Sequence, residues 1–226
     1  HLGDVSDGNT CPEVITRTYQ AEDDCGNIAT CTQTITIDDT TPPTADPLPD
    51  LTFECVDQVP AALITDLTNV ADNCDPDPVV AFVSDVSDGQ TCPETITRTF
   101  TITDDCDNVA TLTQTITIDD ITPPEITCPA ALTVECIGDV PAADITLVTA
   151  SDNCGPVTVI HLGDVSDGNT CPEVITRTYQ AEDDCGNIAT CTQTITIDDT
   201  TPPEITCPPA VTVECIGDVP PADITL

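Results

Sequence analysis

Residues 29–37 read Ala29-Thr30-Cys31-Thr32-Gln33-Thr34-Ile35-Thr36-Ile37, and this stretch decides the fold. Its apolar side chains and its threonines alternate strictly, so that one face of an extended segment is apolar and the other polar. Alternation with a period of two, in β-branched sequence, predicts a half-buried strand. Residues 14–21, 126–128 and 132–136 predict further strands. Asp-Gly, Asp-Asn and Gly-Asn turns lie between them and no helical periodicity is present, so an all-β fold is expected.

The strands recur because the chain repeats itself. Residues 1–43 return letter for letter as 161–203. Asp4-Val5-Ser6-Asp7-Gly8 returns at 85–89 and again at 164–168, which gives a unit of about 80 residues. A unit of this length is too long for one turn of a solenoid and suits one small domain.

Thr-Pro-Pro closes each unit, at 41–43, 122–124 and 201–203. Because proline fixes φ and restricts the residue before it, we expect short stiff linkers there. The prediction is a string of tandem immunoglobulin-like or fibronectin-III-like β-sandwich domains. Two are complete, at 44–121 and 125–200. The C-terminal part of a truncated domain occupies 1–40 and the N-terminal part of another occupies 204–226, so the array is expected to continue in both directions.

The composition narrows the possible partners and the compartment. The chain has 41 acidic residues, three arginines and a net charge of −38, which excludes nucleic acid and anionic membrane as electrostatic partners. No apolar run is long enough for direct membrane insertion. Aromatic residues make up 2% of the chain, so the core of each domain is thin. Fifteen cysteines could form disulfides that stabilise such small cores, and they indicate an oxidising, extracellular compartment.

One disulfide follows from comparing the two complete units. The unit at 125–200 has six cysteines and the unit at 44–121 has four. Cys128 and Cys191 are the two without a counterpart, since Pro47 and Leu112 stand in their places. Two cysteines lost together are best explained as a bonded pair, so we predict Cys128–Cys191.

The other pairings follow from the expected sandwich topology, in which cysteines at the same end of a domain bond to each other. This predicts four disulfides within domains: Cys136–Cys171, Cys154–Cys185, Cys55–Cys92 and Cys74–Cys106. Five cysteines are then left to bond beyond the ends of the chain: Cys11, Cys25, Cys31, Cys207 and Cys215. Zinc binding is the alternative use of these cysteines, but they are widely spaced and no CxxC pair occurs.

Acidic loops form the one chemically suggestive feature. The topology places the Asp-Asp pair at the end of one domain next to Asp-Asn and Asp-Asp loops of the next. Carboxylate and amide oxygens converging from two domains suit Ca²⁺. The alternative is that Asp and Asn simply make turns. The candidate ligands are Asp38, Asp39, Asp72, Asn73, Asp104, Asp105, Asp119, Asp120, Asp152, Asn153, Asp183 and Asp184.

No catalytic constellation is recognisable, so an enzyme is not expected. His1 and His161 occupy one repeat position, where Phe82 stands in the other unit, which favours packing over catalysis. Arg17, Arg98 and Arg177 share another position, in phase with core residues. We expect this arginine to bury its stem and pair with a carboxylate.

Several recurring motifs carry a family resemblance: Gly-Asn-Thr-Cys-Pro (8–12), Asp-Asp-Cys-Gly-Asn-Ile-Ala-Thr-Cys-Thr-Gln (23–33) and Asp-Asp-Thr-Thr-Pro-Pro (38–43). They resemble the hyalin-repeat (HYR-like) domains, in the cysteine-rich form found in giant surface adhesins of gliding Bacteroidetes. The resemblance covers essentially the whole chain. It implies immunoglobulin-like sandwiches, a secreted bacterial protein exported by the type IX system, and a role in surface attachment or gliding. It also implies O-glycosylation at Thr40 and Thr200, in Asp-Thr-Thr sequences.

Two functions of different classes remain open. The first is a stiff stalk or filament of a cell-surface adhesin, whose partners are neighbouring repeats of the same chain and other adhesin chains. The second is a module that binds surface glycans or proteins through acidic, Ca²⁺-dependent loops. Ice binding by the short Thr-x-Thr rows is a third and weaker alternative.

Overall fold

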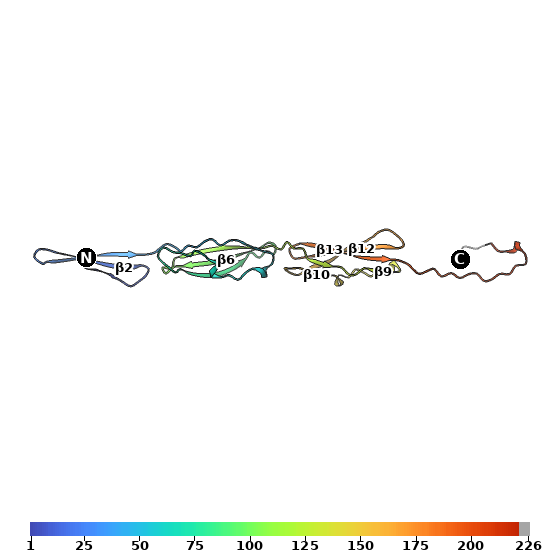
Figure 1. Ribbon diagram of the computed structural model, residues 1–226, viewed down its shortest axis with the longest axis horizontal. Coiled ribbons are helices and arrows are strands. Elements are labelled where there is room, and N and C mark those ends of the chain that lie inside the picture. The colour runs from blue at the N-terminus through green and yellow to red at the C-terminus, as the bar shows by residue number, and fades with distance from the viewer. Residues whose placement is uncertain (222–226) are drawn as a thin grey trace.

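The computed structural model describes residues 1–221 and arranges them as separate β-units in line along one axis. Figure 1 shows a small sheet near the N-terminus, two larger units in the middle and an extended segment towards the C-terminus. We call residues 44–121 the first repeat and 125–200 the second repeat. The expected partial domain at 204–226 carries one 3₁₀ turn, η5 (Ile216–Asp218), and its last five residues lie outside the described part.

The first repeat is built on one four-stranded sheet. Its order is β4-β7-β6-β5, with β4 parallel to β7 and the other pairs antiparallel. A bridge between Thr44 and Ala71 and two 3₁₀ turns lie in the segments outside this sheet. The elements are β4 (Leu51–Phe53), η1 (Val56–Gln58), η2 (Ile64–Asp66), β5 (Val79–Ser87), β6 (Glu94–Thr103) and β7 (Val109–Ile118).

The second repeat has the same layout with a more regular second layer. Its four-stranded sheet has the order β11-β12-β13-β9, and a two-stranded sheet pairs β10 with β8. The elements are β8 (Glu125–Thr127), β9 (Leu132–Val134), η3 (Ile137–Asp139), η4 (Ile145–Leu147), β10 (Thr149–Ser151), β11 (Thr158–Ser166), β12 (Glu173–Glu182) and β13 (Ile188–Ile197). The N-terminal fragment, residues 1–40, keeps three strands in the order β1-β2-β3: β1 (Gly3–Ser6), β2 (Glu13–Glu22) and β3 (Ile28–Ile37).

The predicted all-β, sandwich-like class is confirmed, and the strand patterns agree in detail. The stretch at 29–37 lies within β3, and the run at 14–21 lies within β2. In the second repeat, β13 has the same sequence as β3. There Ile195 and Ile197 are buried while Thr192 and Thr194 are exposed, as the alternation requires.

The core of the first repeat is divided into two apolar clusters by a polar layer. Phe100 and Ile102 form one cluster with Leu67, and both are fully buried. Ile96, Ile116 and Ile118 form the other. Between the clusters, Arg98 and Gln114 point inward from β6 and β7, and the Gln114 amide donates a hydrogen bond of 2.8 Å to the Pro49 carbonyl. Each buried polar group of this layer is thus hydrogen-bonded.

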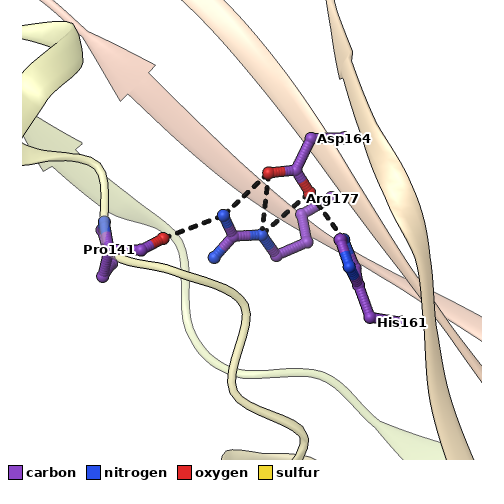
Figure 2. A network of polar contacts seen from close by, with 4 residues as sticks. All are labelled: Pro141, His161, Asp164 and Arg177. Carbon is purple, nitrogen blue, oxygen red and sulfur yellow. Dashed lines mark hydrogen bonds and ion pairs between the residues drawn. The ribbon is translucent and has the colours of Figure 1, made fainter.

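The inward arginine ties the sheet to the loop that covers it, as Figure 2 shows for Arg177 in the second repeat. Its guanidinium donates to the Asp164 carboxylate on β11, at 2.9 Å and 2.7 Å, and to the Pro141 carbonyl at 2.9 Å. His161 contacts the same carboxylate at 2.8 Å and packs on Tyr179. Hydrogen bonding by Arg177 is the main reason that the Asp164 pKa is lowered. The expected pairing of this arginine with a carboxylate is confirmed.

Within residues 1–221, no helix is both long enough and apolar enough to cross a membrane.

Candidate functional site

Cysteines and acidic residues of this chain lie together where one repeat contacts the next. Strand β7 ends at Ile118, and Asp119 and Asp120 follow it directly into the Thr-Pro-Pro linker. The loops that carry Cys154 and Cys185 lie at the facing end of the second repeat. We call the contact between the two repeats the second junction. Its counterpart between the N-terminal fragment and the first repeat is the first junction.

Disulfides cross both junctions. Cys55, which follows β4, bonds to Cys154 in the Asp-Asn-Cys loop of the second repeat. Cys92, which precedes β6, bonds to Cys185 in the Asp-Asp-Cys loop. At the first junction, Cys11 bonds to Cys106, which repeats the Cys92–Cys185 pairing one unit earlier. The Cα atoms of the three pairs lie 5.0–5.3 Å apart, within the usual range for a disulfide.

Four predicted disulfides within domains are therefore wrong, and the structure shows why. The predictions Cys55–Cys92 and Cys154–Cys185 placed each pair at one end of its repeat, and the ends were assigned correctly. However, the short linker brings those two ends face to face. Each of these cysteines therefore bonds to a cysteine of the facing repeat and not to the other cysteine at its own end.

The other two wrong predictions are Cys74–Cys106 and Cys136–Cys171, and only the first of them fails because one of its cysteines bonds to the facing unit. Cys106 bonds across the first junction, and Cys74, Cys136 and Cys171 are free and exposed. The prediction that Cys11 has no partner in the chain is also wrong. In the described part, the free cysteines are Cys25, Cys31, Cys74, Cys136, Cys171, Cys207 and Cys215.

The disulfide deduced from the comparison of the two units is present. Cys128 bonds to Cys191 within the second repeat, with a Cα–Cα distance of 5.7 Å. It ties the segment after β8 to strand β13. In the first repeat, Leu112 occupies the position of Cys191 and packs against the cluster of Phe100, so apolar packing replaces the bond there.

Hydrogen bonds add a second set of ties across each junction. The Asn187 side chain donates to the Asp120 carbonyl at 2.8 Å, and Asn153 donates to Glu54 at 3.2 Å. At the first junction, Asn108 repeats the bond of Asn187 by donating to the Asp39 carbonyl at 3.0 Å. This asparagine was not among the predicted site residues. The signal for it was present, because an Asn is the second residue after Asp-Asp-Cys in all three copies.

Carboxylates from the two sides converge at each junction. At the first junction, oxygens of Asp39, Asp72 and Asp104 lie within 4.8 Å of one another. At the second junction, Asp120 and Asp152, the counterparts of Asp39 and Asp72, form the equivalent group together with the sulfur of Cys154. A cavity of about 190 Å³ adjoins this group.

Two kinds of carboxylate occur at the junctions, and Asp183, a predicted ligand, lies near the second group without being part of it. Asp104 and Asp183 are saturated, since each accepts two backbone N–H bonds and one from the neighbouring Asn side chain. By contrast, one buried oxygen on each of Asp39, Asp72 and Asp152 accepts no hydrogen bond within the described residues. Such oxygens lack compensation for their burial, and a cation would supply it.

The pKa values of three carboxylates at the junctions are shifted, one upward and two downward. Burial raises the pKa of Asp120, and the charges of Asp152 and Asp183 raise it further. Burial also acts on Asp183, but hydrogen bonds from Asn187 and from nearby backbone N–H groups outweigh it, and its pKa is lowered. The pKa of Asp72 is lowered by the backbone N–H groups of Asp75 and Cys74. Of these three carboxylates, Asp120 is the one whose surroundings disfavour the negative charge.

The remaining predicted ligands lie outside these groups. Asp38, Asp105 and Asp184 are exposed, and Asp119 is half-buried without joining a group. Asn73 and Asn153 are also exposed, and their amides donate hydrogen bonds to Asp39 and Glu54 instead of presenting oxygens to the group. Of the two expected glycosylation sites, both exposed, Thr200 donates its hydroxyl to Glu135 at 2.7 Å.

A family model matches the first repeat. Residues 43–118 match the model of the HYR-like domain with 4 cysteines. The matched segment contains Cys55, Cys74, Cys92 and Cys106. No curated protein matches the chain.

Among solved structures, the chain is similar to extracellular cadherin repeats at low identity. The protocadherin gammaB7 EC3-6 cis-dimer structure has 14% identity and a TM-score of 0.31, with 83% of this chain and 60% of that one covered. The protocadherin GammaB4 extracellular domain has 12% identity and a TM-score of 0.33, with 83% and 39% covered. Drosophila N-cadherin EC1-4 has 11% identity and a TM-score of 0.31, with 83% and 57% covered. The chain therefore spans less than two thirds of the length of each of these three structures.

Proposed function

Because residues 43–118 form an HYR-like domain with four cysteines, we propose that the chain is the stiff, extended stalk of a large secreted cell-surface adhesin. The observation that carries this proposal is the pair of disulfides across the second junction, Cys55–Cys154 and Cys92–Cys185. Two covalent bonds and a short proline linker join the same two bodies at three places. A hinge at such a junction would require breaking bonds, so the repeats hold a fixed relative orientation.

The surroundings of the stalk follow from the same features. Disulfides between domains persist in an oxidising environment, which supports an extracellular location. The high negative charge keeps neighbouring chains apart and in solution. Surface attachment or gliding in a bacterium with type IX export is the setting that the HYR-like resemblance supports.

Stiffness is tested by measuring how freely the two repeats move. In small-angle X-ray scattering, the oxidised chain is expected to give the distance distribution of a rod. A variant without Cys55, Cys92, Cys154 and Cys185 is expected to give a broader, more compact distribution. The matched control lacks only Cys128 and Cys191, inside one repeat, and should scatter like the parent. Equal flexibility of parent and junction variant would refute the proposal.

We further propose that each junction binds Ca²⁺. The residues fit the ion: Asp39 with Asp72, and Asp120 with Asp152, offer hard carboxylate oxygens from consecutive units. Three of these carboxylates each have a buried oxygen that receives no donor from the described residues. Bound Ca²⁺ would neutralise carboxylates that otherwise repel each other across the junction. It would add to the stiffness that the disulfides provide.

Calorimetric titration with CaCl₂ tests this part separately. We expect a saturable heat that is lost in the Asp39→Asn/Asp120→Asn variant and kept in the Asp38→Asn/Asp119→Asn variant, which changes the same number of charges one residue away. No heat in the parent, or equal loss in both variants, would remove calcium from the proposal and leave the disulfide-braced stalk intact.

A further inference from the structure

The disulfides that cross the junctions also connect the central strands end to end. Cys92 and Cys106 flank β6, one at each end of this ten-residue strand. Cys171 and Cys185 flank β12 in the same way, and Cys11 precedes β2. The bonds Cys11–Cys106 and Cys92–Cys185 therefore join the segments that contain β2, β6 and β12 in series.

We infer that this series is a covalent tension line that makes the array nearly inextensible. A pulling force passes from Cys11 to Cys106, along β6 to Cys92, and across the next junction to Cys185. Most of the polypeptide that folds the first repeat lies outside this route. A repeat can then lose its tertiary packing without lengthening the chain.

The lengths of the two routes show the size of the effect. From Cys11 to Pro203, the peptide chain takes about 190 residues, and the covalent shortcut through Cys106, Cys92 and Cys185 takes about 32. At about 3.4 Å per fully extended residue, these routes reach about 650 Å and about 110 Å. Because β6 is already extended in the fold, at about 3.3 Å per residue, the shortcut has little slack.

A second covalent route of similar length runs parallel to the first. From Cys106 the chain runs forward to Cys128, whose disulfide leads to Cys191, close to Pro203. From Cys11 to Pro203 this route takes about 34 residues, and its reach at full extension is therefore almost the same as that of the first route. Both routes use Cys11–Cys106. While that bond is intact, either Cys92–Cys185 or Cys128–Cys191 is sufficient to keep the line short, and the loss of both lengthens it.

Single-molecule stretching of the whole oxidised chain, held by its termini, tests this redundancy. The two matched controls are the pair variants Cys92→Ala/Cys185→Ala and Cys128→Ala/Cys191→Ala, each of which should reach full extension within about 10 Å of the parent.

The combination of the two pair variants should behave differently. Its shortest covalent route runs from Cys11 along the chain to Cys55, across to Cys154 and on to Pro203, which takes about 93 residues. The combined variant should therefore extend about 210 Å further than the parent, since the route gains about 61 residues at about 3.4 Å each.

The measured quantity is the length at full extension, which depends on the covalent route and not on how well a variant folds. Non-reducing peptide mapping verifies that Cys11–Cys106 and Cys55–Cys154 are still formed in each variant. A parent that extends by several hundred ångströms without reductant would overturn the tension line, as would a combined variant that stays as short as the parent. The line depends on the disulfide pairing alone, so it stands whether or not the chain serves as an adhesin stalk.

Discussion

Replacing Arg98 by methionine should open the first repeat locally. The Arg98 side chain is 2% exposed and donates to both oxygens of Asp85 at 2.9 Å and to the Pro60 carbonyl at 2.8 Å. Methionine keeps the apolar stem and removes all three donors. The change therefore isolates the polar contribution of the guanidinium from its packing.

The magnitude follows from how far the two partners can return to water. A hydrogen bond to a charged group contributes about 1.5–3 kcal/mol, and breaking a fully buried ion pair costs about 3–5 kcal/mol. The Asp85 side chain is 34% exposed, so water replaces part of the lost interaction. We expect Arg98→Met to lower the free energy of opening of β6 by about 2–4 kcal/mol, which corresponds to about 30- to 700-fold faster amide exchange.

Hydrogen exchange followed by mass spectrometry is the suitable assay because it reads each repeat separately. The matched control is Arg17→Met. Arg17 makes the same bidentate pair with Asp4, but its side chain is 36% exposed and it has no carbonyl acceptor among the described residues. Exposed pairs of this kind contribute little, so exchange in β2 should not change measurably. Equal effects of the two substitutions would refute the view that burial gives the first arginine its role.

Three further predictions address the core, the acidic group and the pairing rule. Phe100→Ala removes a fully buried ring from the repeat that has no counterpart of the Cys128–Cys191 disulfide. We expect a loss of about 3–5 kcal/mol by denaturant unfolding, against no loss for Val83→Ala at an exposed position on β5. Asp120→Asn should stabilise the metal-free chain at pH 7. Because the pKa of Asp120 is raised in the folded state, its ionisation destabilises the fold as pH rises through that pKa, and the gain from Asn should disappear as pH falls towards 3.8. Denaturant unfolding of both proteins across this pH range measures the gain, and a difference that is constant with pH would contradict the prediction. Appending a copy of residues 148–200 should pair Cys136 and Cys171 with the appended copies of Cys154 and Cys185, as shown by peptide mapping; a Cys136–Cys171 bond would contradict the rule.

The sequence pattern was sufficient to predict the strands and one disulfide. The alternation in β3 and β13 specifies which residues face inward, because a strand has only two faces. The Cys128–Cys191 bond was deduced because both cysteines are replaced together in the other repeat. Neither inference required knowledge of how one repeat contacts the next.

The acidic groups were predicted only in outline. Twelve candidate ligands followed from the motifs, and the structure brings together Asp39, Asp72 and Asp104 at one junction and Asp120 with Asp152 at the other. Adjacent Asp residues in a motif point to different sides, so sequence alone does not distinguish Asp120 from Asp119. The tertiary structure makes that choice by burying one of them against the facing loops.

The sequence by itself determined a repeating, all-β, cysteine-rich chain, because alternation and repetition are local properties. Only the tertiary structure decided that three of the four disulfides within residues 1–221 join neighbouring units. Assigning cysteines to the two ends of a repeat leaves two partners available to each of them, one in the same repeat and one in the next. The choice depends on the distance across a junction, which the short linker and the facing loops set in three dimensions.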